Sequence, residues 1–207
     1  LIYEQIERCK TIISDMGSLG KDDQYVKIID FFTLLFEASQ PYKNFEKQII
    51  FRLNGVSQSH EGISINEKMI PLVKREPELI HGIRNIVHNA LKFSKSHVDI
   101  NLITNSRKIN LEITDDGKGF PNDITNMIGE PFLKKSNFYL MEVKNRTSEE
   151  GMGLGLFIAN ILLEKTKGRL KFSNMQQIEN DGKKRITGAK VEISWERSSI
   201  EVLQWDK

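Results

Sequence analysis

Apolar side chains recur at helical spacing in three segments of this chain. The segment from Tyr25 to Ser39 is strongly apolar and ends just before Pro41, a residue that cannot continue a helix. Between Glu76 and Phe93 the apolar residues fall on one helical face. A third helix is predicted from Leu154 to Thr166.

Strand patterns lie between and after these helices. Val98–Thr104 and Lys108–Thr114 alternate apolar and polar residues, as antiparallel strands with one covered face do. The other predicted strands are Gln48–Leu53, Gly62–Ile65, Arg169–Ser173 and Ala189–Trp195. Residues 198–207 carry no clear signal. The order predicts an α+β fold, a two-layer α/β sandwich whose helices gather on a mixed, mainly antiparallel sheet.

The first residues show a different, seven-residue spacing. A short heptad seam is formed by Ile2, Ile6, Cys9, Ile13 and Met16. Because two heptads are marginal alone, we interpret them as the end of a longer helical hairpin or dimer helix. Gly17 and Gly20 end it. We therefore predict a truncated hairpin helix at 1–20, a catalytic domain at 21–197 and a C-terminal tail at 198–207.

Composition narrows the classes of partner. The 207 residues are 39% hydrophobic and 28% charged, which is ordinary for a globular protein, and the net charge is only +2. We therefore expect no binding to nucleic acid or to a membrane surface. No window approaches the roughly 18 apolar residues of a membrane span. The single cysteine excludes an intrachain disulfide. The chain has no initial methionine, and we expect it to be a piece of a longer protein.

Two asparagines in the second helix suggest a metal site. Asn85 and Asn89 are four residues apart, so both amides lie on one helical face. An amide oxygen is a hard ligand suited to Mg²⁺, while its NH₂ group can donate to phosphate oxygens. One turn further on, Lys92 adds a positive charge and Phe93 an aromatic face for a base. The alternative is that the two asparagines are merely solvated.

A second motif follows the predicted strand that ends near Thr114. Asp115 can accept a hydrogen bond from the exocyclic amine of adenine, and Gly117 and Gly119 let the backbone close over the base. Guanine presents an oxygen at that position, so a buried carboxylate would reject it. The alternative is an ordinary Asp-Gly turn.

A third motif precedes the last helix. The backbone amides of Gly151, Gly153, Leu154, Gly155 and Leu156 can hold phosphate oxygens at the positive end of the helix dipole. A plain flexible loop is the alternative. The preceding segment, residues 133–150, lacks clean periodicity, and a long loop of this kind is usually a lid. Its cations, which include Lys134, Lys135 and Arg146, can close on a triphosphate.

Together these segments resemble the ATP-binding domain shared by sensor histidine kinases, type II topoisomerases, Hsp90 chaperones and mismatch-repair ATPases, the GHKL or Bergerat fold. The matching motifs are the N box at Asn85 and Asn89, the G1 box at Asp115–Gly119, the F box at Pro131–Phe132 and the G2 box at Gly151–Gly155. Their order and spacing are those of histidine kinases, over about residues 24–197.

Further strings are similar to the RegB/PrrB/ActS group of redox-responsive sensor kinases. They are Glu7–Lys10, Gln40–Tyr42, His81–Ile86, Ile128–Phe132 and Leu156–Ala159. The resemblance implies a membrane-anchored homodimer with a cytoplasmic kinase. Such a kinase uses ATP and Mg²⁺ to phosphorylate a histidine on a helical hairpin, and passes the phosphoryl group to an aspartate of a response regulator.

Two departures refine this expectation. The phosphoacceptor histidine belongs to a first hairpin helix that these residues lack, so we do not expect the chain to autophosphorylate alone. His88 stands where ATP-hydrolysing relatives carry a catalytic glutamate, next to Asn89. Two other functions stay open: an ATPase conformational clamp, and a non-enzymatic phosphotransfer or interaction module.

Cys9 has two interpretations. A lone cysteine in a helical seam is most often a small core residue. Arg8 and Lys10 flank it, however, and positive charge favours a thiolate. The resemblance implies a redox-sensing cysteine in this context.

Overall fold

The main sheet has six strands, and its two central strands show why the sequence forms it. The computed structural model describes residues 27–58, 70–120, 154–179 and 182–203. In β5 (His97–Thr104) the side chains of Val98, Ile100 and Leu102 are fully buried, whereas Asp99 and Asn101 between them are partly exposed. β6 (Lys108–Asp115) alternates in the same way. One face of the sheet is therefore apolar and the other polar.

The strand order is β3-β2-β5-β6-β8-β7. β2 pairs with β5 in parallel, and the other neighbours are antiparallel. The remaining strands are β2 (Gln48–Leu53), β3 (Val56–Gln58), β7 (Arg169–Ile178) and β8 (Lys184–Glu196). This mixed, mainly antiparallel sheet confirms the predicted fold class.

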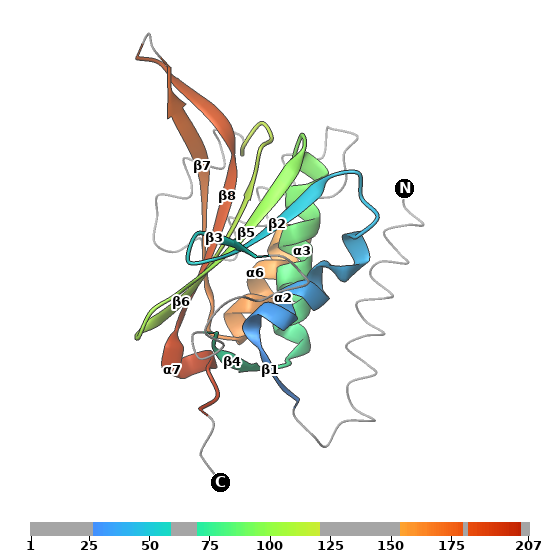
Figure 1. The fold of residues 1–207 in the computed structure, drawn as a ribbon, viewed down its shortest axis with the longest axis vertical. Coiled ribbons are helices and arrows are strands. Elements are labelled where there is room, and N and C mark those ends of the chain that lie inside the picture. The colour runs from blue at the N-terminus through green and yellow to red at the C-terminus, as the bar shows by residue number, and fades with distance from the viewer. Residues whose placement is uncertain (1–26, 59–69, 121–153, 180–181, 204–207) are drawn as a thin grey trace.

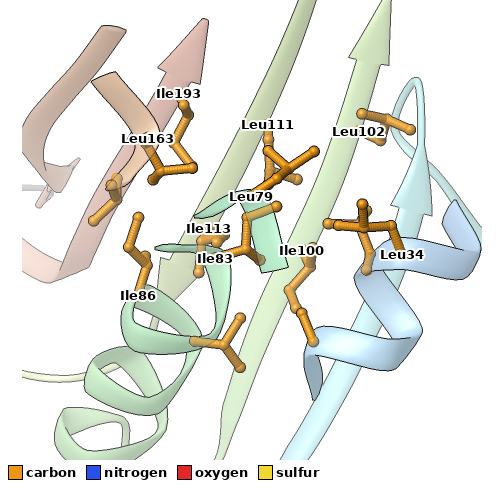
Figure 2. Packing of buried hydrophobic residues seen from close by; sticks show 14 of the residues in the cluster. Leu34, Leu79, Ile83, Ile86, Ile100, Leu102, Leu111, Ile113, Leu163 and Ile193 are labelled. Atoms are coloured by element: carbon orange, nitrogen blue, oxygen red, sulfur yellow. The ribbon is translucent and has the colours of Figure 1, made fainter. Parts of the chain in front are cut away.

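Three helices cover the apolar face of the sheet: α2 (Phe31–Ser39), α3 (Pro77–Phe93) and α6 (Leu154–Lys165) (Figure 1). Between the two layers, Ile83 and Ile86 of α3 lie among Ile100, Ile113 and other sheet residues in one apolar core (Figure 2). The predicted second and third helices are thus confirmed, with ends that differ by about one residue.

A glycine brings α3 and α6 close together. A Cβ atom at Gly82 of α3 would lie 2.6 Å from Cγ of Leu163 in α6. Real carbon atoms do not approach so closely, so only glycine permits this helix spacing. The contact joins the helix that carries the two asparagines to the helix that follows the third glycine motif.

The first predicted helix is wrong over its initial residues. Ile28–Asp30 form strand β1, which pairs antiparallel with β4 (Leu72–Lys74), and the helix begins only at Phe31. The carboxylate of Asp30 accepts a hydrogen bond from the backbone N–H of Thr33 at 2.8 Å, so it caps the helix at this point. A continuous apolar run does not show where a buried strand ends and a helix starts.

Other elements went unpredicted or extend further than predicted. The strands β3 and β4, the 3₁₀ helix at Gln40–Tyr42 and the short helix α7 (Arg197–Ile200) were not anticipated. β7 and β8 run beyond the predicted limits because their ends form a polar hairpin without an apolar face to mark it (Figure 1). Glu201 bridges to Val73, so part of the predicted tail contacts the domain. The predicted strand Gly62–Ile65 and the heptad seam lie outside the described residues.

Candidate nucleotide site

The two asparagines of α3 differ in their surroundings. Asn85 is only 6% exposed, and its Nδ2 donates to the carbonyl of His81 at 2.9 Å, one turn earlier. Asn89 is half-buried on the same helical face. The interpretation of both as merely solvated residues is therefore wrong for Asn85. A carboxamide fixed by such a bond to its own helix is held in one orientation.

Asp115 is the last residue of β6 and is 6% exposed. Its Oδ1 accepts hydrogen bonds from the backbone N–H groups of Gly117 at 2.8 Å and Ala189 at 3.3 Å. Both of the hydrogen bonds found for this carboxylate in the described part of the chain go to Oδ1. The second oxygen, Oδ2, has no hydrogen bond to the described residues.

Burial raises the pKa of Asp115, although the hydrogen bonds from Gly117 and Ala189 oppose this. The neighbouring charge of Asp116 also raises that pKa, and Lys47 lowers it. A buried carboxylate of this kind gains more from a donor than a solvated one does, because it has lost its water.

The glycines around Asp115 are required by close backbone contacts. A Cβ atom at Gly117 would lie 2.3 Å from the carbonyl oxygen of Phe93, and one at Gly188 would lie 1.7 Å from the carbonyl oxygen of Asp115. Gly119 has a φ of +78°, which disfavours other residues. Gly117 and Gly119 were singled out by their motif. Gly188 belongs to no motif and was missed.

The end of α3 presents Lys92 and Phe93 to solvent. The Phe93 ring is 47% exposed, and Nζ of Lys92 lies 5.3 Å from its centroid. The contact of the Phe93 carbonyl with Gly117 places this helix end beside the loop that follows Asp115. The exposed Phe93 ring therefore belongs to a helix end that contacts the loop after Asp115, and a flat base can stack on such a ring.

Asp116 holds the segment between α3 and β5. Its carboxylate accepts from the backbone N–H of Lys95 at 2.7 Å and of Ser96 at 3.0 Å, and from the Ser96 hydroxyl at 2.6 Å. Partial burial opposes ionisation, but hydrogen bonds from Ser96, Lys95 and His97 hold the pKa of Asp116 well below its usual range. Sequence reasoning gave Asp116 no role, because its partners lie about twenty residues away.

Lys47, just before β2, was also missed. Its Nζ donates to the carbonyls of Leu91 and Ser94, each at 2.6 Å. These carbonyls lie at the end of α3, where a helix has no partners of its own for its last oxygens. A single lysine before a strand has no sequence signal that would reveal this contact.

The glycine-rich third motif is described only in part. α6 begins at Leu154, and Gly155 and Leu156 are half-buried in its first turn. Gly151 and Gly153 lie outside the described residues, as do Lys134, Lys135 and Arg146 of the predicted lid and the candidate redox residue Cys9. No helix in the described ranges is long and apolar enough to cross a membrane.

The α/β sandwich, with paired asparagines on one helix and a buried aspartate at the end of a neighbouring strand, defines a class of ATP-binding domain. The chain belongs to the family described as histidine kinase-, DNA gyrase B-, and HSP90-like ATPase, whose model matches residues 74–198. ATP is therefore the nucleotide of this domain.

The sequence is similar to sensor histidine kinase RegB of Cereibacter sphaeroides, with 36% identity over 94% of this chain and 41% of that protein. It is 24% identical to the histidine-protein kinase ArlS of Staphylococcus haemolyticus, over 80% of this chain and 34% of that protein. The chain therefore resembles the catalytic domain of a RegB-like sensor kinase, and it spans less than half of these relatives.

Solved structures agree on the fold. The mycobacterial sensor histidine kinase MprB has a TM-score of 0.56 and 18% identity, over 86% of this chain and 100% of that one. The catalytic domain of histidine kinase ThkA has a TM-score of 0.54 and 16% identity, over 84% of this chain and 97% of that one.

Proposed function

We propose that this catalytic domain of a sensor histidine kinase transfers the γ-phosphoryl group of ATP to a histidine on a helical hairpin, for relay to a response regulator. The observation that carries the proposal is the buried Asp115, whose Oδ1 is occupied by backbone donors beside the end of the asparagine helix. The kinship to RegB supports the two-component context.

Asp115 selects the base. Oδ2 accepts a hydrogen bond from the exocyclic amine of adenine, while Phe93 covers one face of the ring. Guanine places a carbonyl oxygen against the same carboxylate, and two acceptors repel each other. Sites built on such a bond discriminate by roughly 10⁴-fold when the partner is lost.

Asn89 is the proposed Mg²⁺ ligand, with Asn85 assisting at the phosphates and Lys92 adding charge. The residues fit this ion, because amide oxygens are hard donors and Asn85 is held in place by His81. The bound ion neutralises charge on the triphosphate oxygens. The ion would keep several of its coordination positions for water and phosphate oxygens, as Mg²⁺ commonly does.

Gly151, Gly153, Leu154, Gly155 and Leu156 hold the phosphates through their backbone amides, and Lys134, Lys135 and Arg146 close over them. The acceptor imidazole nitrogen then attacks the γ-phosphorus in line. The new N–P bond forms as the P–O bond to the β-phosphate breaks, and ADP leaves.

His88 supports transfer over hydrolysis. His88 directly precedes Asn89, at the position where a hydrolytic clamp carries a glutamate that activates water. The ring centroid of His88 lies 5.4 Å from that of Tyr42. An imidazole packed on a tyrosine is a poor substitute for that base. The ATPase clamp is therefore the weaker candidate. The non-enzymatic module is weaker for a different reason: an adaptor of that kind has lost the glycine motifs, which this sequence retains.

We further propose that the whole protein is a membrane-anchored homodimer with this domain in the cytoplasm, and that oxidation of Cys9 lowers kinase activity. The oxidised form is an intersubunit disulfide or a sulfenic acid. Cys9→Ala should abolish the response to oxidant and the dimer band on non-reducing gels. An unchanged response would refute the redox proposal alone.

The test of the kinase proposal uses ATP labelled at the γ-phosphate, Mg²⁺ and a supplied hairpin that carries the acceptor histidine. We expect the hairpin to acquire a label that acid removes and base does not, the behaviour of phosphohistidine. Asn89→Ala should abolish the labelling. Steady release of phosphate without labelling would favour the ATPase clamp, and an acid-stable label would contradict transfer to histidine.

A further inference from the structure

Lys47 is bound to the end of the helix that carries the proposed ATP-binding residues. It lies between the 3₁₀ helix and β2, it is half-buried, and its Nζ donates to the carbonyls of Leu91 and Ser94 at 2.6 Å each. A third carbonyl, that of Lys92, lies 3.4 Å away. An ammonium group at a helix C-terminus satisfies unpaired carbonyls and complements the negative end of the helix dipole.

The same helix end contacts the loop that follows the proposed adenine-selecting residue, Asp115. The carbonyl oxygen of Phe93 lies so close to Gly117 that a Cβ atom there would be 2.3 Å away, and the N–H of Gly117 donates to Asp115 at 2.8 Å. Lys47 is thus joined to Asp115 through the last turn of α3 and the loop after β6.

Lys47 also acts on Asp115 through its charge. Two charged groups influence the pKa of Asp115: Asp116 raises it and Lys47 lowers it. Asp116 is itself engaged by the Lys95–His97 segment, and His97 Nδ1 lies 3.4 Å from its Oδ2. Lys92 at the end of α3 is exposed above Phe93. The charge of Lys47 therefore acts in the same direction as the hydrogen bonds from Gly117 and Ala189, against the effects of burial and of Asp116 on the pKa of Asp115.

We propose that Lys47 is a positioning residue of the adenine site: it fixes the last turn of α3 against the loop after Asp115 and so holds the Asp115 carboxylate in place for the base. This inference rests on the proposed function, in which Asp115 binds the adenine of ATP.

The test measures the dissociation constant for ATP by titration calorimetry on the 207-residue chain, at about pH 6 and about pH 8. Lys47→Met removes both the charge and the donors, whereas Lys47→Gln removes the charge and keeps an amide donor. Lys43→Met is the matched control. Lys43 is exposed in the same segment, and its side chain makes no hydrogen bond or ion pair with the described residues.

We expect Lys47→Met to weaken ATP binding about tenfold. The loss should be larger at the lower pH, because an uncompensated Asp115 protonates more readily and then no longer accepts from the amine. Lys47→Gln should show the same pH dependence with a smaller loss at the higher pH. Lys47→Arg should restore most of the affinity, and Lys43→Met should leave it unchanged. In an Asp115→Asn background, Lys47→Gln should add little.

Three results would overturn the inference: unchanged affinity in Lys47→Met, a loss equal at both pH values in Lys47→Gln, or a full additional loss in the Asp115→Asn background. If Lys47→Met does not fold, Lys47→Gln decides the question. If the wild-type chain binds no ATP at either pH, the proposed function itself is refuted. If the wild type binds ATP and its Lys47 variants bind it as tightly, only the inference about Lys47 is refuted.

Discussion

Asp115 and Asp116 are adjacent, yet their environments shift their pKa values in opposite directions. Burial raises the pKa of Asp115, because its hydrogen bonds from backbone N–H groups only partly offset the effect of burial. Asp116 collects hydrogen bonds from Lys95, Ser96 and His97 that outweigh its partial burial. Asp115 is therefore the candidate for ligand binding, whereas Asp116 is engaged with the segment between α3 and β5.

Asp115→Asn should separate binding from stability. The amide oxygen can still accept from Gly117 and Ala189, while the NH₂ group now faces the adenine amine. ATP binding should weaken by about 1.5–3 kcal/mol, the usual worth of a hydrogen bond to a charged group. Folding raises the pKa of Asp115, so the free protein loses stability as pH rises through the interval between the ordinary and the raised value.

Asp115→Asn removes the buried charge and with it this loss of stability. The ligand-free variant should therefore unfold at the same temperature as wild type, or at a higher one, at neutral pH. Calorimetric titration measures the change in ATP affinity, and thermal unfolding measures the change in stability. Unchanged ATP affinity would refute the assignment of Asp115.

Asp116→Ala should destabilise the ligand-free domain by about 1–3 kcal/mol at neutral pH, because Lys95 and Ser96 lose their acceptor. Folding lowers the pKa of Asp116, so its stabilising effect is complete above its ordinary pKa of 3.8 and declines as pH falls below that value. Thermal unfolding of both proteins across this range should show the difference shrinking with acid. A difference that stays constant would show that the ionised Asp116 carboxylate is not what stabilises this segment.

The elements that position the site meet through close helix contacts, which Gly82 makes possible. Gly82→Ala improves helix propensity by up to about 1 kcal/mol, but the new methyl overlaps Leu163, and overpacking costs typically about 1–3 kcal/mol. We expect a net loss in thermal stability. Leu163→Ala in the same chain should relieve the overlap, so that Gly82→Ala is less harmful there. A Gly82→Ala chain as stable as wild type would contradict the tight contact.

Prediction from sequence succeeded for elements with a clear period. β5, β6 and α3 carry long alternating or helical patterns, and their predicted positions are confirmed within about one residue. Prediction failed where the spacing of apolar residues does not distinguish a helix from a strand. Ile28–Asp30, for example, were predicted as part of the first helix but form β1. Short strands such as β3 and β4 hold too few residues to show a pattern.

The residues of the candidate site also divide into those that the sequence predicted and those that it did not. Asn85, Asp115 and Gly117 were anticipated because each belongs to a local motif with a chemical reason. Lys47 and Gly188 were not, because their importance lies in contacts with residues distant in the chain. Local spacing suggests candidates for ligand binding, whereas the groups that support them depend on tertiary packing.

The whole domain places a helix end, a strand end and a glycine loop around one buried carboxylate. Lys47 in the connection before β2, and Asp116 and Gly117 in the connection after β6, hold these parts together. Base selection as we propose it would therefore depend on the assembled sandwich and not on Asp115 alone. The family match covers residues 74–198, which include Asp115 and α3.

Parallel calorimetric titrations of the 207-residue chain with ATP and with GTP, each with Mg²⁺, address this selection without any partner protein. ATP should bind, and GTP should bind at least about 10³-fold more weakly because it presents an oxygen to Asp115. Asp115→Asn should lose most of this preference. If wild type binds GTP as tightly as ATP, the buried carboxylate does not read the base and the proposed site is wrong.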